Sequence, residues 1–449
     1  LQTRRAAEAL ALVERAIAAN RRLAAFHDTH GSVLAALGRH QDAANAHARA
    51  LRLDPAHTGA RFNFANALHA WGHPPAAVTA FHQTLALNPA HGKAWFNMGN
   101  ALRTLGAADA AVEAFTRAIA LDPGMAEAHN NLGDALAAVG RHDEAVAQHR
   151  LVVRQRPADA RSWYNLGAAL QQQGTYEEAE IAYREALRRD PRHVPSLNNL
   201  GGVLRRLNHP EHAEDCHRQA IALSPDFAES YHNLGNALAA QGRYGEAMAC
   251  HEEALSRNPD LATATHGLAL LALMNGDLAH GLAGYERRFA ARAVTVDRPL
   301  PPPRWDGTPL DTGRLVLWRE QGVGMETLFA ATLADATARA RGPVTLYTDP
   351  RLVPLFARSF PAVTVMDEAE LDRAPPADMA AHCPTGSLPG LLRRDLAAVP
   401  AVPWLAPDPV RVAAWRDRLA ALGPGLTVGI GWRTAMLTQI GRASCRERV

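Results

Sequence analysis

The sequence predicts an all-α superhelix of stacked helical hairpins, an α-solenoid, followed by a partial α/β domain. Three observations support this prediction. Seven prolines recur at intervals of 34 residues, small residues repeat in the same register, and the helical pattern gives way near residue 313 to short strand-like runs. A fixed period of this length is the signature of a repeat architecture, in which each unit packs only on its neighbours.

Three columns of residues define the repeat. The prolines are Pro55, Pro89, Pro123, Pro157, Pro191, Pro225 and Pro259. The small residues are Gly31, Ala65, Gly99, Gly133, Gly167, Gly201 and Gly235, and the alanines are Ala43, Ala77, Ala111, Ala145, Ala179, Ala213 and Ala247. Within a period, apolar residues at helical spacing are interrupted once, and a proline ends the second half. Each period is therefore predicted to be a helix-turn-helix hairpin.

This pattern resembles that of the tetratricopeptide repeat (TPR) family. In one period the characteristic residues are Trp95, Met98, Gly99, Leu102, Ala111, Phe115 and Pro123. The resemblance covers more than half of the chain. It implies that the hairpins stack into a superhelix whose concave surface binds a protein or an extended peptide.

The predicted organisation has six segments. They are a partial TPR that supplies only a second helix (1–23), seven units of 34 residues (24–261), a degenerate eighth TPR (262–291), a Pro-rich linker (292–312), the N-terminal half of an α/β domain (313–439) and a non-native tail (440–449).

One position of the first helix is asparagine in six successive units. The column consists of Asn63, Asn97, Asn131, Asn165, Asn199 and Asn233. A primary amide offers both a donor and an acceptor, so such a column can pair with a peptide backbone of any sequence. The column resembles the asparagine ladder of O-GlcNAc transferases, which implies a protein substrate in the groove. The alternative is that each asparagine bonds locally between repeats.

Histidine occupies the aromatic position of several second helices. These residues are His47, His149, His217 and His251, where other units have phenylalanine or tyrosine. We predict that they are packing residues, and we predict no metal site because no three ligands are grouped on one face.

After the Pro-rich segment, strand-like runs at 314–318, 344–349, 363–367 and 426–432 alternate with helical stretches. Alternation of this kind predicts a parallel sheet with helices on its faces. The stretch "EQGVGMETLF" then follows the first strand, at the edge where open α/β sheets bind ligands.

Segments of this region, among them "WREQGVG", "HCPTGSLP" and "VGIGWR", resemble the C-terminal region of bacterial TPR proteins with a glycosyltransferase-like domain. That domain is related to heptosyltransferases and O-GlcNAc transferase-like GT-B enzymes. The resemblance implies two Rossmann-like halves, of which this chain has only the first, acceptor-side half. It places Glu320, Gln321, Gly322 and Gly324 in an acceptor loop, and it implies a nucleotide-sugar donor for the full-length parent.

The chain departs from that family at Met325, where the relatives usually carry an aspartate that is a candidate catalytic base. A thioether cannot accept a proton. We therefore predict either that Glu326 substitutes, with His382 as a further catalytic candidate, or that the site is inactive. Without the second half, we expect no transferase activity and no cofactor in this fragment. The alternative function is a non-catalytic TPR scaffold with a degenerate Rossmann-like appendage.

The last ten residues, "IGRASCRERV", match one reading frame of a common short-read sequencing adapter. We therefore expect that the gene was cut near Gln439 and that Cys445 is foreign.

Composition argues against several classes of partner. The formal net charge is +2, from 47 basic and 45 acidic residues without a basic block, so we expect neither nucleic acid nor a membrane as partner. The other cysteines, Cys216, Cys250 and Cys383, form no CxxC pair with each other or with Cys445, which favours a reducing cytoplasm over a disulfide framework.

Overall fold

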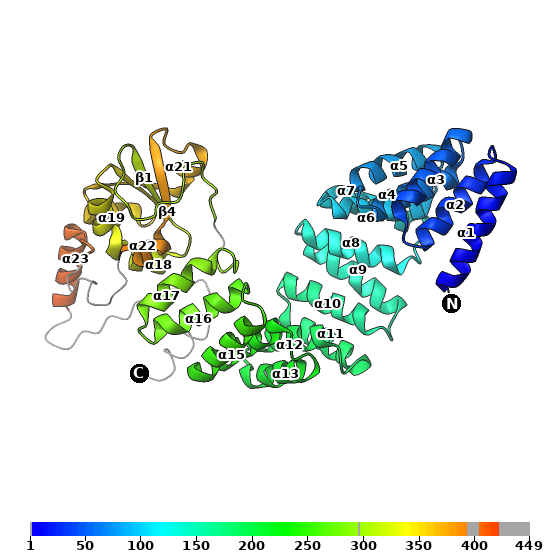
Figure 1. The fold of residues 1–449 in the computed structure, drawn as a ribbon. Coiled ribbons are helices and arrows are strands. Elements are labelled where there is room, and N and C mark those ends of the chain that lie inside the picture. The colour runs from blue at the N-terminus through cyan, green and yellow to red at the C-terminus, as the bar shows by residue number, and fades with distance from the viewer. Residues whose placement is uncertain (1, 295–296, 393–403, 422–449) are drawn as a thin grey trace. The chain divides into compact units, whose positions relative to one another are not determined.

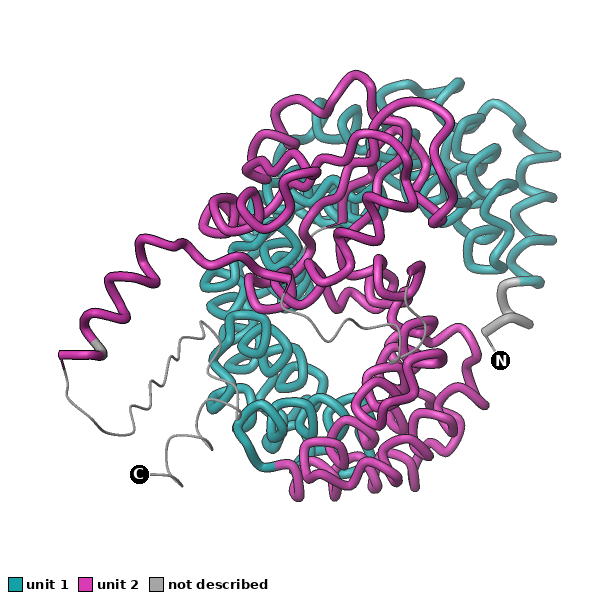
Figure 2. Tube along the Cα trace, turned by 90° about the vertical axis from the view of Figure 1, so that its left-hand side faces the viewer, with its two compact units in different colours: residues 1–209 teal, residues 210–449 magenta. Residues whose placement is uncertain are grey.

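The computed structural model describes residues 2–294, 297–392 and 404–421 (Figure 1). The chain divides into two compact units, residues 1–209 and residues 210–449, which Figure 2 colours separately. The described part of unit 1 is entirely helical, and unit 2 combines helices with one sheet.

Unit 1 is a row of helical hairpins. Its helices are α1 (Gln2–Ala19), α2 (Ala24–Ala36), α3 (His40–Leu53), α4 (Thr58–Ala70), α5 (Pro74–Leu87), α6 (Gly92–Thr104), α7 (Ala108–Leu121), α8 (Ala126–Ala138), α9 (His142–Gln155), α10 (Ala160–Gln173), α11 (Tyr176–Arg189) and α12 (Val194–Arg206). Each helix packs on the next, and the first helices of successive hairpins, α2 to α12 in even numbers, also pack on one another. We call the surface that carries the asparagine column on these first helices the inner face.

In five of the seven units the small residue of the first helix is a glycine against which a ring of the second helix lies: Gly31, Gly99, Gly133, Gly167 and Gly235. A Cβ atom added at Gly99 would lie 2.6 Å from the ring of Phe115, and one added at Gly133 would lie 2.6 Å from His149. The four histidines of this column are each no more than 2% exposed. Their predicted role as packing residues is confirmed.

Most hairpin turns use a glycine in the left-handed backbone region. Gly106, for example, has a φ of +74° and nothing within 4 Å of the place a Cβ would take. Asn208 adopts the same conformation in its own turn, with a φ of 69°. Glycine and asparagine enter this region at the lowest cost, which explains the break in the helical pattern of each period.

Unit 2 begins with further hairpins. Five helices begin this unit, namely α13 (Pro210–Leu223), α14 (Ala228–Ala240), α15 (Tyr244–Arg257), α16 (Ala262–Met274) and α17 (Leu278–Tyr285). They are followed by the 3-10 turn η1 (Glu286–Arg288). The second helix of the last hairpin, α17, has 8 residues where α15 has 14. This short helix lies where the sequence predicts a degenerate unit.

The rest of unit 2 is an α/β layer, by which we mean four strands with their connecting helices. The strands are β1 (Arg314–Trp318), β2 (Val344–Thr348), β3 (Val363–Asp367) and β4 (Met379–Pro384). The helices are α18 (Val323–Phe329), α19 (Leu333–Ala340), α20 (Val353–Ser359), α21 (Glu368–Arg373), α22 (Leu388–Leu392) and α23 (Pro409–Ala420), with 3-10 turns η2 (Ala330–Thr332) and η3 (Thr385–Ser387).

All described strand pairs are parallel, and their order is β3-β2-β1-β4. Three of the predicted strands are confirmed, whereas the predicted strand at 426–432 lies outside the described residues. β4 was not predicted. Because β1 has β2 on one side and β4 on the other, the strand order reverses between β1 and β4, and loops there diverge.

Both faces of the sheet are covered. Leu315 and Leu317 point into one core with Leu333 and Phe356, while Trp318 points into the other. This alternation is the period of two expected for a strand.

The Pro-rich segment predicted as a linker contributes to the α/β layer. The backbone N–H of Trp305 donates to the His382 carbonyl at 2.8 Å, and the His382 N–H donates to the Pro303 carbonyl at 3.2 Å. Trp305 is only 4% exposed and belongs to the larger core. The α/β layer therefore starts before the predicted boundary at residue 313.

Candidate functional site

The asparagine column of unit 1 forms hydrogen bonds between adjacent hairpins along the inner face. The side-chain amide nitrogen of Asn97 donates to Asn66 Oδ1 at 2.7 Å, and that of Asn131 donates to Asn100 Oδ1 at 2.8 Å. Asn165 donates to Asn130 Oδ1 at 2.7 Å. The asparagines therefore do bond between adjacent hairpins, as one of the two interpretations requires.

These contacts use only part of each amide. Among the described residues, the structure shows no hydrogen bond to the Oδ1 atoms of Asn97, Asn131 and Asn165, and all three side chains are half-buried rather than enclosed. Each amide also keeps a second N–H. The local bonds hold the amides in one orientation and leave an acceptor and a donor on the inner face.

The column is less regular at its ends. Asn63 Nδ2 donates to Asp28 Oδ1 at 3.1 Å, and His47 Nδ1 lies 2.8 Å from the same oxygen. Burial would raise the pKa of Asp28, but the hydrogen bonds from His47 and Asn63 outweigh it and lower the pKa. Asn199 donates to the Tyr183 hydroxyl at 3.1 Å. Asn233 lies half-buried on α14 of unit 2.

In unit 2, the first residue of the predicted acceptor loop is enclosed. Glu320 is 2% exposed and accepts two hydrogen bonds of 3.0 Å from Arg288, which is fully buried. The remaining N–H groups of Arg288 donate to the Tyr285 carbonyl, to Glu286 Oε1 and to Ser387 Oγ. All five guanidinium donors are thus satisfied.

Two aromatic rings pack against Arg288, the cation of its ion pair with Glu320. The guanidinium carbon of Arg288 lies 4.7 Å from the ring centre of Tyr285 and 4.5 Å from that of Phe289. Burial raises the pKa of Glu320, against the opposing charge of Arg288. A Cβ at Gly386 would lie 1.9 Å from the Glu320 carboxylate, so only glycine fits there. The carboxyl ends of β1 and β4 are therefore tied to the last hairpin of unit 2.

The other acceptor-loop residues differ in their surroundings. Gln321 donates to the Tyr285 hydroxyl, which also belongs to the last hairpin. A Cβ at Gly322 or Gly324 would meet nothing within 4 Å, and neither has a positive φ. Packing within the described chain gives no reason for glycine at these two positions, so they leave the loop accessible.

The two catalytic candidates are not brought together. Glu326 is 4% exposed, and its Oε2 accepts from the Thr348 hydroxyl and from the Asp349 N–H. It lies near Leu333 and Phe356, on the α19 and α20 face of the sheet. His382 pairs with Val316 of β1, whose side chain points to the opposite face. Met325 is 36% exposed.

The environments of these candidates also differ. Burial raises the pKa of Glu326, although its bond with Thr348 lowers it. Burial lowers the pKa of His382, and its Nδ1 accepts from the indole N–H of Trp318 at 3.1 Å. A raised carboxyl pKa suits a general acid or base. His382, the other predicted catalytic residue, does not lie beside Glu326.

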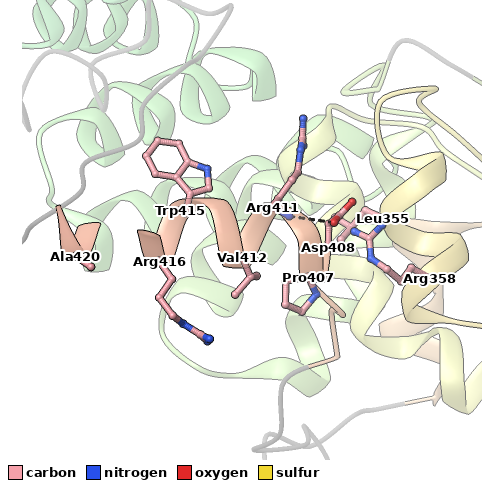
Figure 3. Close-up of a pocket in the computed structure, with 9 residues that line it drawn as sticks. All are labelled: Leu355, Arg358, Pro407, Asp408, Arg411, Val412, Trp415, Arg416 and Ala420. Atoms are coloured by element: carbon pink, nitrogen blue, oxygen red, sulfur yellow. Dashed lines mark hydrogen bonds between the residues drawn. The ribbon is translucent and has the colours of Figure 1, made fainter. Parts of the chain in front are cut away.

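Two larger cavities lie in the described α/β part of unit 2. One, of about 330 Å³, is lined by α17, Trp305, Cys383 and Ser387 beside the Arg288 pair. The other, of about 760 Å³, lies between α20 and α23 (Figure 3). Trp415 and Arg411 project from α23 there, and Trp415 is 59% exposed. None of the predicted site residues lines this second cavity.

Within the described ranges, no group of three or more His, Cys, Asp or Glu side chains is placed to hold a metal ion. No described helix is long and apolar enough to cross a membrane. The adapter-like tail at 440–449 lies outside the described residues.

Family models of the tetratricopeptide repeat match residues 62–126, 124–192, 158–226 and 228–261. The chain carries tetratricopeptide repeats. Among curated proteins, the FlbA protein of Caulobacter vibrioides (strain ATCC 19089 / CIP 103742 / CB 15) is 37% identical over 184 residues. The match covers 37% of this chain and 30% of FlbA, so the chain spans less than a third of that relative's length.

Solved structures are also similar, among them the two that follow. TTC0263, a thermophilic TPR protein in Thermus thermophilus, is 26% identical over 40% of this chain and 99% of its own, with a TM-score of 0.35. YrrB, described as a TPR protein with an unusual peptide-binding site, is 19% identical over 42% of this chain and 97% of its own, also with a TM-score of 0.35.

The TPR units contain functional candidates that the sequence interpretation missed. Asn66 and Asn100, the acceptors of the asparagine column, are spaced by the same 34 residues and continue to Asp134. The repeat period alone would have found them. Arg288 had no such signal, because nothing in its neighbourhood in the sequence marks it as a buried partner of Glu320.

Proposed function

We propose that the TPR hairpins bind an extended segment of a partner protein along the inner face of unit 1. The observation that carries this proposal is the set of amides at Asn97, Asn131 and Asn165, each held by one bond to the preceding hairpin.

An extended peptide offers backbone N–H and C=O groups at regular intervals, whatever its side chains. The free amide oxygens would accept from its N–H groups, and the second amide hydrogens would donate to its carbonyls. Each such bond contributes about 0.5 to 1.5 kcal/mol net, so several are needed for useful affinity. The fixed orientation helps because little side-chain entropy is lost on binding.

The description of YrrB as a protein with a peptide-binding site agrees with this proposal. So does the small net charge of +2, which gives nucleic acid or an anionic membrane little to bind. A reducing compartment such as the cytoplasm suits Cys216, Cys250 and Cys383, which form no disulfide among the described residues.

The test is a binding screen against an immobilised array of peptides, followed by fluorescence anisotropy with the best peptide. Replacing Asn97, Asn131 and Asn165 together by alanine should weaken binding by about tenfold or more, since several bonds of this strength are lost. The matched control is Gln41→Ala, which removes an exposed amide from the second helix α3. Equal affinity of the triple variant and the control, both measured well below their melting temperatures, would refute the proposal.

A second candidate concerns the α/β layer. We propose that in a longer parent this layer forms the acceptor side of a Rossmann-like, GT-B-type glycosyltransferase that takes a nucleotide-sugar donor. Two observations favour it. The loop with the accessible Gly322 and Gly324 follows β1 at the reversal of strand order, where parallel sheets bind ligands. In that function Glu326, with a raised pKa, is the candidate base.

The alternative, a non-catalytic scaffold, is favoured by the enclosure of Glu320 and by the separation of Glu326 from His382 on opposite faces. Calorimetry with nucleotide-sugars on the parent protein separates the two. Heat of binding supports the transferase, and no heat supports the scaffold.

A further inference from the structure

The inner-face hydrogen bonds of unit 1 change their register at one hairpin. Asn66 and Asn100 each accept from the asparagine of the following hairpin, and Asp134 occupies the same position one period later. Asn165, however, donates to Asn130 instead. The Asp134 carboxylate is therefore left out of the series.

No other described group replaces the missing donor. In the described residues, no hydrogen bond of 3.5 Å or less reaches Asp134. Its nearest charged neighbour is Arg103, whose NH1 lies 4.0 Å from Oδ2, and the Nε2 atom of His149 lies 3.6 Å from Oδ1. The carboxylate side chain is 43% exposed, so a partner from solution can reach it.

A hollow adjoins this carboxylate. A cavity of about 290 Å³ is lined by Asp134 together with His149, Asn165 and Gln172. Its remaining walls are alanines of α8 and α10, at two of which the preceding hairpin has Arg103 and Thr104. The volume is about ten times the roughly 30 Å³ that one water molecule occupies in the liquid. The alanines thus leave the hollow with smaller walls than the residues one period earlier would give.

One residue that lines the hollow, His149, is buried and has a ring nitrogen that is unsatisfied within the described chain. His149 is 2% exposed, and its Nδ1 atom has no hydrogen-bond partner in the described residues. Burial lowers the pKa of His149, so at neutral pH this ring supplies no positive charge to Asp134. In the described part of the chain, the other charged side chain within 4.0 Å of Asp134 is Arg103, and an ion pair as long and exposed as theirs contributes about 1 kcal/mol or less.

We propose that this hollow anchors a lysine or arginine side chain of the extended peptide bound on the inner face. The proposal rests on the proposed peptide-binding function. The alanines cover the aliphatic stem of such a side chain, and its charged end meets Asp134 and the free amide oxygen of Asn165. An acidic side chain would be repelled, and a short neutral one would leave the hollow unfilled.

The test uses two fluorescein-labelled peptides of alternating serine and alanine, identical except for a central lysine in one and a central glutamine in the other. Fluorescence anisotropy at low salt should show the lysine peptide binding about tenfold more tightly, as expected for one charge-assisted contact. Asp134→Asn, which keeps the shape of the side chain, should reduce that ratio to about one. Ala138→Leu, which narrows the hollow but keeps the charge, should reduce it as well.

Glu113→Gln is the control, because it removes an equal charge from an exposed position of α7 that does not line the cavity. It should leave the ratio unchanged. If both peptides bind equally to the unaltered protein, the anchor is refuted while peptide binding stands. If neither binds, the proposed function fails and the anchor with it.

Discussion

The TPR hairpins and the α/β layer hold their polar groups in different ways. In the hairpins, one kind of contact recurs, such as the amide bonds of Asn97 and Asn131 to the preceding hairpin. In the α/β layer, a single guanidinium, that of Arg288, satisfies Glu320 and Ser387 and joins residues up to 99 positions apart. The amide contacts of the first region therefore repeat along the chain, whereas the Arg288 contact of the second region occurs once and joins segments far apart in the sequence.

The substitution with the largest expected effect on stability is Arg288→Met. It leaves the Glu320 carboxylate buried without its partner, which should lower the free energy of unfolding of unit 2 by about 3 to 5 kcal/mol. Urea denaturation followed by tryptophan fluorescence measures it. The double variant Arg288→Met with Glu320→Leu should recover most of the loss, because no charge is then left buried. An unchanged urea midpoint in the single variant would show that the contact between Arg288 and Glu320 does not stabilise unit 2.

A second test uses acid. Burial lowers the pKa of His251 from 6.5 to about 4, so folding favours the neutral ring. The unfolded chain then binds more protons than the folded one between these two values, and stability falls as the pH drops from about 6.5 towards 4. A shift of this size corresponds to roughly 3 kcal/mol.

The matched variant is His251→Phe, since Phe115 fills the same position in another hairpin. Its stability, measured by urea denaturation across this pH range, should fall by less than that of the unaltered protein. Parallel curves for the two proteins would show that the His251 ring does not carry the effect.

The next largest loss of stability is expected when a side chain is added at the repeated glycine. Gly99→Ala forces a methyl group against the Phe115 ring at 2.6 Å and should cost about 1 to 3 kcal/mol. Gly202→Ala is the control within the same kind of helix. Nothing lies within 4 Å of its Cβ position, so the substitution should stabilise the helix by up to about 1 kcal/mol. Thermal melts followed by circular dichroism should therefore shift in opposite directions, and shifts in the same direction would contradict the packing account.

The smallest effect concerns a single amide. Asn131→Ala removes one hydrogen bond to Asn100 and should lower the free energy of unfolding by about 1 kcal/mol. Gln41→Ala, at an exposed position, should change it by less than about 0.5 kcal/mol. A loss of several kcal/mol in Asn131→Ala would mean that the hairpins, too, depend on single strong contacts.

The sequence predicted the regular parts well, for a physical reason. Each hairpin packs only on its neighbours, so the same residue types are needed at the same positions of every period. The glycine, aromatic and asparagine columns can therefore be seen in the sequence without coordinates. β1 and β3 were predicted with their observed bounds because they are rich in β-branched and apolar residues.

The rest depended on contacts between distant residues. β4 contains alanine and histidine in place of such residues, and its strand conformation follows from pairing with β1 and with the Pro303 to Trp305 segment. The enclosure of Glu320 likewise needs Arg288, which lies 32 residues earlier in the chain. No local pattern predicts either contact.

The central claim is that a guest peptide lies on the first helices of the hairpins. The most direct measurement is photo-crosslinking with a benzophenone-labelled form of the best-binding peptide, with the crosslinked residues located by mass spectrometry. The account predicts crosslinks to α6, α8 and α10, lost when Asn97, Asn131 and Asn165 are replaced by alanine. Crosslinks confined to the second helices, or to the loop at Glu320 to Glu326, would contradict it.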